Sequence, residues 1–410
     1  MFKVIPRGRV YHSLSKDILD MFRTLFSKRD LQKVSHFEKT IAEYMKSNHC
    51  IAFPFARTAF YFSLKAVKIP ENSEIIMPPI TIKPFLDVVL CLKLKPVFVD
   101  LDPDTLCYDC NQLEKAITKN TKAINITYLY GIVPDMDPII NIAKKYNLFI
   151  VEDFSHNINA EYKGKKLGTF GDVGIYSASS TKTFDIHGAG LLITENNDIA
   201  NSLRKYQNEL ESPPRIILLQ KIITNFIRNI ATKRAVFSLL TFPFIKLLKM
   251  ISSEEVIKFT GTRPTEPIEK IPKSWLYTFD PLQAEFGFRE LSTLEKNDAH
   301  RINNVHKIKK ILKDAGKEMV YPMERKDSKC VFWQFSIYFN NALKTQDKLH
   351  KNNVDSATTS LMLISTLPYL QHQYKMPVAE NIHNNLLIVP AFPGLTKNDI
   401  NLIGKALQVE

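Results

Sequence analysis

Short apolar runs alternate with stretches of helical periodicity through the first half of the chain. Residues 148–151 and 173–177 are two of these runs, and each has the length of a buried strand. Strands that alternate with helices favour a mainly parallel, doubly wound α/β sheet. From Leu282 onwards, the pattern predicts one long helix that leads into a smaller C-terminal domain.

Length and composition set the domain organisation that we expect. A chain of 410 residues, 45% of them apolar, can bury a large core and predicts one large domain with a smaller one. We expect the large domain over 1–200, a helical insertion over 201–270, and the long helix with the small domain over 271–410. The N-terminus lacks the apolar core of a secretion signal, and five cysteines, an odd number, favour reduced thiols. A cytoplasmic protein is therefore expected.

Two patterns that often signal a function are incomplete in this chain. Cys107 and Cys110 have the spacing of a metal or redox pair, but no second Cys/His pair completes a zinc site, so no metal is expected. The formal net charge of +13 would suit nucleic acid only if the basic residues clustered in a recognisable module with interleaved aromatic residues. The sequence holds no such module, and a nucleic-acid partner is not expected.

An acid and a lysine follow two successive strands. Asp153 lies at the C-terminal end of the first strand, and Lys182 follows the second through a small, hydroxyl-rich segment. A pyridoxal phosphate (PLP) enzyme needs these two groups, because the lysine binds the aldehyde covalently and the acid keeps the ring nitrogen protonated. Either residue alone is more often a solvated loop residue at a strand end. The prediction therefore depends on what surrounds the two.

These surroundings resemble the DegT/StrS-type sugar aminotransferases, a branch of the fold-type-I PLP enzymes. The resemblance runs from about Phe37 to the C-terminus, and its motifs lie at 55–60, 75–81, 96–102, 128–131, 377–380 and 393–396. It implies a large domain with a mainly parallel seven-stranded sheet between helices, and a smaller C-terminal α+β domain. It also implies a homodimer that moves an amino group, expected from glutamate, to a keto group of a nucleotide- or lipid-linked sugar.

The resemblance also implies roles for particular residues. Lys182 would carry the cofactor and move a proton, and it predicts transamination because dehydrating relatives have histidine there. Asp153 would bind the ring nitrogen and His156 the ring hydroxyl, although a structural role for His156 stays open. Ser177 would bind the cofactor phosphate.

Two further parts of the cofactor site follow from the same resemblance. Ala56, Arg57 and Thr58 occupy the phosphate turn before a helix, where backbone N–H groups hold an anion. The alternative for Arg57 is an exposed arginine at a helix N-terminus. Ile82 aligns with an aromatic residue that stacks on the cofactor ring, so stacking here is expected to be aliphatic.

The chain departs from the family pattern at three places. Ile82 is one, and Gly188-Ala189-Gly190 stands where the family has Glu-Gly-Gly. The third is an absent asparagine of an Asn-Tyr-Arg motif, expected near 276–278, that reaches across the dimer to the phosphate; Arg57 is the residue expected to compensate. These departures leave open a catalytically silent homologue that acts as a membrane-associated scaffold. The joint retention of Asp153, His156, Ser177 and Lys182 argues against that alternative.

Residues 215–251 form a segment that the family normally lacks. It has seven basic residues and no acidic one, and its apolar positions fall at helical spacing: Ile216, Leu219, Ile223, Phe226, Ile227 and Ile230. Pro243 is expected to bend or break a second helical run. Neither run has the roughly 20 apolar residues of a spanning helix. The pattern predicts helices that lie in a membrane interface, which would place the protein peripherally on the inner face of the membrane. The alternative is a hairpin packed on the protein or in a dimer interface.

Overall fold

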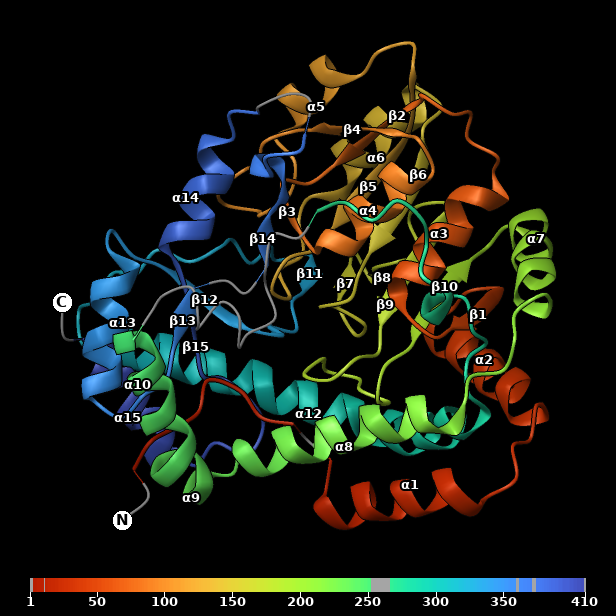
Figure 1. Cartoon of the computed structure of the whole chain (residues 1–410). Helices are drawn as coiled ribbons and strands as arrows, with labels where there is room; N and C mark the ends of the chain where they lie inside the picture. The colour runs from red at the N-terminus through yellow and green to blue at the C-terminus, as the bar shows by residue number, and fades with distance from the viewer. Residues whose placement is uncertain (1–2, 11, 252–265, 359–360, 371–373, 409–410) are drawn as a thin grey trace.

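The computed structural model describes residues 3–10, 12–251, 266–358, 361–370 and 374–408. A seven-stranded sheet in the order β1-β10-β9-β6-β5-β2-β4 forms its centre (Figure 1). These strands are β1 (His49–Phe53), β2 (Glu74–Met77), β4 (Lys95–Phe98), β5 (Thr121–Thr127), β6 (Phe149–Asp153), β9 (Val173–Ser177) and β10 (Gly190–Thr194). Only β10 runs antiparallel to its neighbours, β1 and β9. The predicted mainly parallel seven-stranded sheet is confirmed.

Helices cover this sheet on both faces, and its central strands are buried almost throughout, as their apolar sequences require. The helices of this part are α2 (Gln32–Met45), α3 (Ala56–Ala66), α4 (Lys83–Cys91), α5 (Cys110–Ala116), α6 (Met136–Lys145) and α7 (Asn197–Asn208). Short strands β3 (Ile80–Thr81), β7 (Glu161–Tyr162), β8 (Lys165–Lys166), β11 (Ser328–Lys329) and β14 (Met362–Leu363) form two small sheets beside it. Because parallel strands end at one edge, Asp153 and Ser177 emerge there together.

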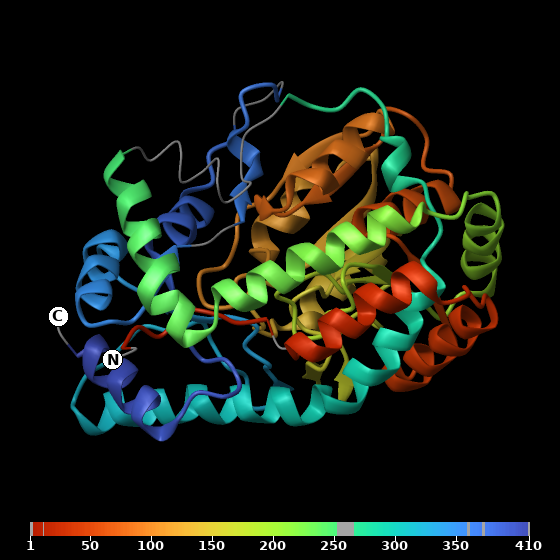
Figure 2. The same cartoon turned by 60° about the horizontal axis from the view of Figure 1, so that its bottom comes forward.

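One long helix, α12 (Pro281–Asp314), runs along the molecule and begins where the sequence predicts it (Figure 2). Beyond it lies an antiparallel three-stranded sheet of β12 (Phe335–Tyr338), β15 (Leu386–Val389) and β13 (Ala357–Thr358). Around this sheet lie α13 (Ala342–Lys351), α14 (Pro377–Asn385), α15 (Lys397–Leu407) and two 3-10 turns, η2 (Lys273–Trp275) and η3 (Ile364–Thr366). The smaller C-terminal α+β part is therefore present, and the boundaries at 200 and 270 stay a prediction.

The segment 215–251 is helical, as predicted. It consists of α8 (Arg215–Ala231), α9 (Arg234–Val236), the π-helical turn η1 (Phe237–Thr241) and α10 (Phe242–Ile251). Pro243 does not end the second helical run. It lies in the first turn of α10, directly after the π turn η1, where the hydrogen-bond pattern changes and the missing N–H group is tolerated. Helix α8 lies beside α1 (Leu14–Phe26), as Figure 2 shows.

Half of the predicted apolar stripe of α8 faces outward, although Leu218 and Ile222 of the same helix are buried. Ile216, Ile223 and Ile227 are exposed, Ile227 to 59%, whereas Asn225 and Asn229 are buried. Helix α1 shows the same inversion, with exposed Phe22 and Phe26 and buried Asp17, Asp20 and Thr24. Amphipathic helices of globular proteins normally turn their apolar face to the core. None of the helices in the described residues is long and apolar enough to cross a membrane.

Candidate active site

A cavity of about 1300 Å³ opens at the C-terminal edge of the parallel strands. Most of the predicted site residues line it: Lys182, Asp153, His156, Ser177, Ala56, Arg57 and Ile82. The N-terminal segment, the insertion and the C-terminal part contribute further walls. The fold therefore brings together residues that lie more than a hundred positions apart in the chain.

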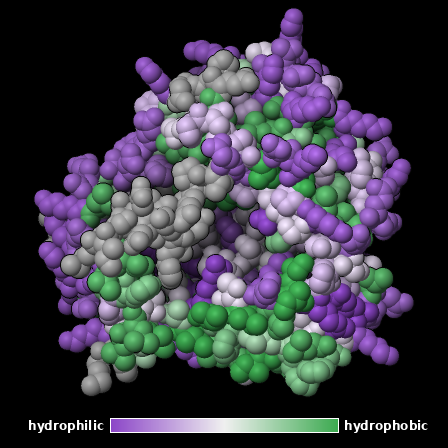
Figure 3. Space-filling view, viewed as in Figure 1, coloured by the Kyte–Doolittle hydropathy of each residue, from purple (hydrophilic) through white to green (hydrophobic). Residues whose placement is uncertain are grey.

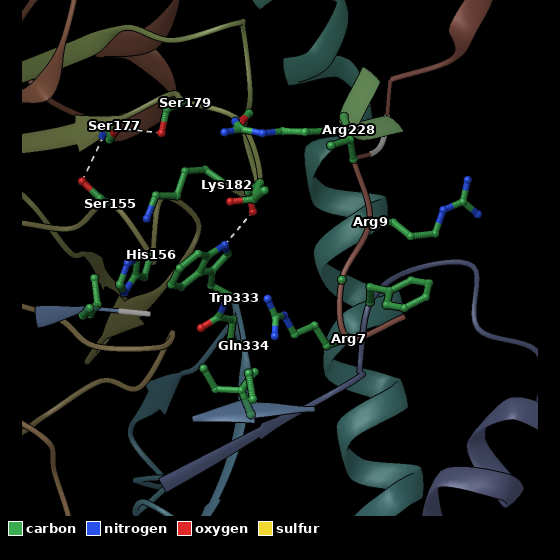
Figure 4. A pocket seen from close by; sticks show the side chains of 18 of the residues that line it. Arg7, Arg9, Ser155, His156, Ser177, Ser179, Lys182, Arg228, Trp333 and Gln334 are labelled. Atoms are coloured by element: carbon green, nitrogen blue, oxygen red, sulfur yellow. Dashed lines mark hydrogen bonds between the residues drawn. The ribbon is translucent and has the colours of Figure 1, made fainter. Parts of the chain in front are cut away.

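Lys182 extends across this cavity (Figure 4). Its Nζ atom lies 3.9 Å from the centre of the Trp333 ring. Burial lowers the pKa of this amine to about 7, and Asp153 only partly opposes the shift. A substantial fraction of Lys182 is therefore unprotonated near neutral pH, which is the form that reacts with an aldehyde.

Asp153 ends β6 and is buried beneath the cavity. Its Oδ1 atom accepts hydrogen bonds from the hydroxyl (2.5 Å) and backbone N–H (3.1 Å) of Ser155. Burial raises the pKa of Asp153, whereas the hydrogen bonds from Ser155 and the charge of Lys182 counteract that rise. A buried carboxylate of this kind stabilises a protonated nitrogen that lies within hydrogen-bond distance of it.

His156 is buried next to Asp153 and is neutral, because burial and the charge of Lys182 lower its pKa well below the usual value. Its Nδ1 atom accepts the backbone N–H of Tyr130 at 3.1 Å. The ring proton of the neutral imidazole therefore sits on Nε2. His156 thus offers a hydrogen-bond donor, as its predicted contact with a ring oxygen requires.

The first turn of α3 could hold an anion. The N-cap residue Phe55 provides no side-chain cap, and the Thr58 N–H donates to the Phe55 carbonyl, so the N–H groups of Ala56 and Arg57 are the ones that a ligand could use. Gly190 permits the close approach of β10, since a Cβ atom there would lie 2.2 Å from the Phe55 carbonyl oxygen. Ser177 lines the same cavity, and its hydroxyl donates to Ser179 at 3.0 Å.

The three remaining predicted cofactor contacts have different surroundings in the structure. Arg57 is half-buried, and its guanidinium lies 4.0 Å from the Phe55 ring centre and 4.4 Å from that of Trp275. Thr58 is not among the cavity-lining residues, because its hydroxyl donates to the Trp275 carbonyl at 2.7 Å. Ile82 lines the cavity from the residue before α4.

Trp333 was not anticipated from the sequence. It stacks on His156 with ring centres 3.9 Å apart, and its indole N–H donates to the Thr181 carbonyl at 2.6 Å. Its backbone reaches the site because Gly131 has no side chain; a Cβ atom there would lie 2.5 Å from the Trp333 nitrogen. The chain has only two tryptophans, Trp275 and Trp333, and both contact site residues. The small number of tryptophans was the one feature of the sequence that could have pointed to Trp333.

Most basic residues of the insertion point into the protein, which the sequence did not predict. Arg215 donates to the carbonyls of Thr24 (2.6 Å) and Ser27 (2.7 Å) at the end of α1. Arg228 donates to the Ser180 hydroxyl at the cavity, and Arg234 pairs with Asp399 of α15. Lys221 lies near Phe55. The side chain of Lys249 lies outside the described residues.

A buried polar network fastens α1 and α8 to the loop that carries Lys182. His12 Nδ1 lies 3.2 Å from Asp17, and its Nε2 lies 3.0 Å from the Asp185 carbonyl. Burial disfavours the charged imidazole, but Asp185 and Asp17 outweigh burial and raise the pKa of His12 to about 9. Asn225 bonds Asp185 and His187 in the same network. This network explains why the two helices turn polar faces inward.

The residues of the cavity fit PLP. Lys182 supplies an amine that is partly unprotonated near neutrality, and Asp153 supplies a buried carboxylate for a ring nitrogen. The uncapped first turn of α3 supplies N–H groups for a phosphate, and the Nε atom of Arg57 is buried there without a hydrogen-bond partner.

Comparisons with known proteins agree with this arrangement. The model of the DegT/DnrJ/EryC1/StrS aminotransferase family matches residues 15–212 and 268–408. GDP-perosamine synthase of Caulobacter vibrioides is 26% identical over 385 residues, 91% of this chain and 89% of that protein. The uncharacterized protein MJ1066 of Methanocaldococcus jannaschii is 36% identical over 172 residues, 42% of this chain and 45% of that protein.

A solved structure supports the same fold. The PLP form of Spr1654 from Streptococcus pneumoniae superposes with a TM-score of 0.73 at 18% identity, covering 98% of this chain and 97% of that one. The family model leaves residues 1–14 and 213–267 unmatched, and the insertion lies within the second of these segments. The chain belongs to the DegT/DnrJ/EryC1/StrS aminotransferase family, and it is a PLP-dependent transaminase of the sugar aminotransferase type.

Proposed function

We propose that the protein transfers an amino group from glutamate to a keto group on a diphosphate-linked sugar, in which the diphosphate carries either a nucleotide or a lipid. One matched relative is named GDP-perosamine synthase, which supports an acceptor of this kind. Glutamate is the donor that the resemblance of the sequence implies.

The observation that carries the proposal is a pair of arginines beside Lys182. Arg7 comes from the N-terminal segment and Arg228 from α8, and both line the cavity (Figure 4). Within the described residues, neither guanidinium forms an ion pair: Arg228 donates to the Ser180 hydroxyl, and the nearby Asp355 accepts from the backbone N–H of Arg7. Cations without counter-ions suit anionic substrates. They would bind the phosphates of the sugar in one half-reaction and the carboxylates of glutamate in the other.

The other cavity residues would act on the cofactor and on the substrate that the two arginines bind. Bound PLP supplies an aldehyde and an electron-accepting ring. Lys182 would hold the cofactor and then move a proton to and from the substrate carbon, a task suited to a pKa of about 7. Asp153 would hold a proton on the ring nitrogen, and His156 Nε2 would donate to the ring oxygen. Trp333 and Ile82 would exclude water from the reacting atoms. A silent scaffold has no supporting observation among these residues.

We expect Arg228→Met to raise KM for a diphosphate-linked keto-sugar about 10- to 100-fold, because it removes a charge-assisted hydrogen bond of about 1.5–3 kcal/mol. The kcat value should change little. The measurement is 2-oxoglutarate release from glutamate, with nucleotide-linked, lipid-linked and unphosphorylated keto-sugars compared. Lys205→Met, which replaces an exposed lysine of α7, is the control. Equal activity on the unphosphorylated sugar would contradict the proposal.

We also propose that the inverted helices bind the surface of an anionic membrane. Their exposed apolar residues form an apolar face (Figure 3): Ile18, Leu19, Phe22, Leu25 and Phe26 of α1, Ile216, Ile223 and Ile227 of α8, Leu239 and Leu240 of η1, and Phe244 and Leu247 of α10. Large exposed apolar patches mark interaction sites. The acids of α1, Asp17 and Asp20, are buried, and exposed Lys16, Lys233 and Lys246 lie in or between these helices. A lipid surface with negative charge complements such a face.

We expect the double substitution Phe22→Ser and Phe26→Ser to lower binding to anionic vesicles by at least about 100-fold, since each buried phenyl side chain contributes about 1.5–3 kcal/mol. Vesicle flotation measures this effect. Val320→Ser, which also replaces an exposed apolar residue, is the control. The alternative is that the face is a subunit interface. In that case the wild-type protein would not bind vesicles, and its dimer would dissociate on the double substitution. The predicted homodimer is measured by sedimentation in the same series.

A further inference from the structure

Lys221 of the insertion contacts the two residues that precede α3. Its side chain leaves the inner side of α8, and Nζ lies 4.2 Å from the Phe55 ring centre and 3.4 Å from the Pro54 carbonyl oxygen. A Cβ atom built on Gly188, which lines the cavity, would lie 3.5 Å from Nζ. Lys221 forms no ion pair with a carboxylate in the part of the chain that the structure describes.

A second cation contacts the same aromatic ring. The Arg57 guanidinium lies 4.0 Å from the Phe55 ring centre, and its Nε atom is buried without a hydrogen-bond partner. Burial, and secondly the charge of Arg57, lower the pKa of Lys221 to about 8, although Asp280 opposes this shift. Burial also lowers the pKa of Arg57 to about 10. Burial makes the charged forms of both side chains less stable. An anion bound between them would stabilise those charged forms.

These cations converge on the uncapped N-terminus of α3. Phe55 is the N-cap of that helix, and both cations contact its ring next to the first turn. Ala56 and Arg57 line the cavity that Lys182 enters, so an anion bound here belongs to the same site. The expected asparagine near 276–278 is absent, and Trp275 packs against Arg57 at that place.

We propose that Lys221 and Arg57 together bind the phosphate of PLP, so that the insertion completes the cofactor site from within one chain. This inference rests on the cofactor site described above. It does not depend on which sugar is aminated. It assigns a binding role to a helix that lies outside the matched family segments.

Binding of two cofactor forms by the apoprotein tests the inference. We expect Lys221→Met to raise Kd for PLP about 10- to 100-fold, the loss of one charge-assisted hydrogen bond. Kd for pyridoxal, which has no phosphate, should change less than about threefold. Quenching of tryptophan fluorescence reports both, because Trp275 and Trp333 lie at the site. Lys221→Arg should restore much of the affinity for PLP.

The controls separate a local effect from a general one. Lys205→Met removes an exposed charge on α7 and should leave both Kd values unchanged. Thermal unfolding of each variant checks that it is folded. The inference is overturned if Lys221→Met leaves Kd for PLP unchanged, or if it weakens PLP and pyridoxal equally. Normal PLP binding by the wild type without amination of any sugar would refute the proposed reaction and leave this inference standing.

Discussion

Lys182→Ala is expected to abolish both covalent capture of PLP and amino transfer. The substitution removes the only amine of the described residues that lines the cavity and whose pKa lies near 7. We expect kcat to fall by at least about 10⁴-fold, the upper range for a positioned acid–base group. The visible absorbance of the bound cofactor and borohydride labelling of residue 182 measure capture, and 2-oxoglutarate release measures transfer.

The pH dependence of capture follows from the same amine. Only the unprotonated lysine reacts, so with a pKa of about 7 the capture rate should rise about tenfold per pH unit below 7 and level off above it. A lysine with its usual pKa of 10.5 would instead keep rising up to that pH. Stopped-flow absorbance measures the profile. Partial rescue of Lys182→Ala by a small added amine would show that the variant lacks only the amino group, whereas full activity without it would refute the assignment.

Asp153→Asn is expected to lower kcat about 10²- to 10³-fold, the usual effect of removing one preorganised electrostatic contact. The amide keeps the shape of the side chain, so the change removes mainly the charge that would hold a proton on the ring nitrogen. Asp153 also raises the pKa of Lys182, so the midpoint of the capture profile should shift to lower pH in this variant. Steady-state kinetics and the capture profile measure the two effects.

A matched control for this prediction is Asp137→Asn, which removes an exposed carboxylate that pairs with Lys163. That variant should keep wild-type kinetics. If Asp153→Asn keeps more than about a tenth of kcat, Asp153 does not have the predicted role.

Prediction from the sequence succeeded where short local patterns carried the information. The strands before Asp153 and Lys182 and the long helix from 281 follow from apolar runs and periodicity, because burial on a sheet demands them. The order of the motifs along the chain indicated the family, and the family pattern predicted the cofactor residues. The helical pattern of α8 defined an apolar side, but it could not say what that side faces.

Side chains that meet across the fold could not be inferred in this way. Trp333 reaches Lys182 because Gly131 lets two distant backbones approach each other closely, and Lys221 reaches Phe55 because its side chain extends from α8 to the segment after β1. The sequence pattern predicted that the basic residues of the insertion lie on one charged surface. In the structure, Arg215, Lys221 and Arg234 are half-buried against other segments, and Arg228 lines the cavity.

The sequence by itself therefore determined the α/β class and the family, and it predicted the acid and the lysine of the cofactor site. Each of these depends on residues that are near neighbours in the chain. Only the tertiary structure decided that α1 and α8 bury a polar network and expose their apolar sides. The physical reason is that the ion pair between His12 and Asp185 joins segments 173 residues apart, and no local pattern encodes such a contact.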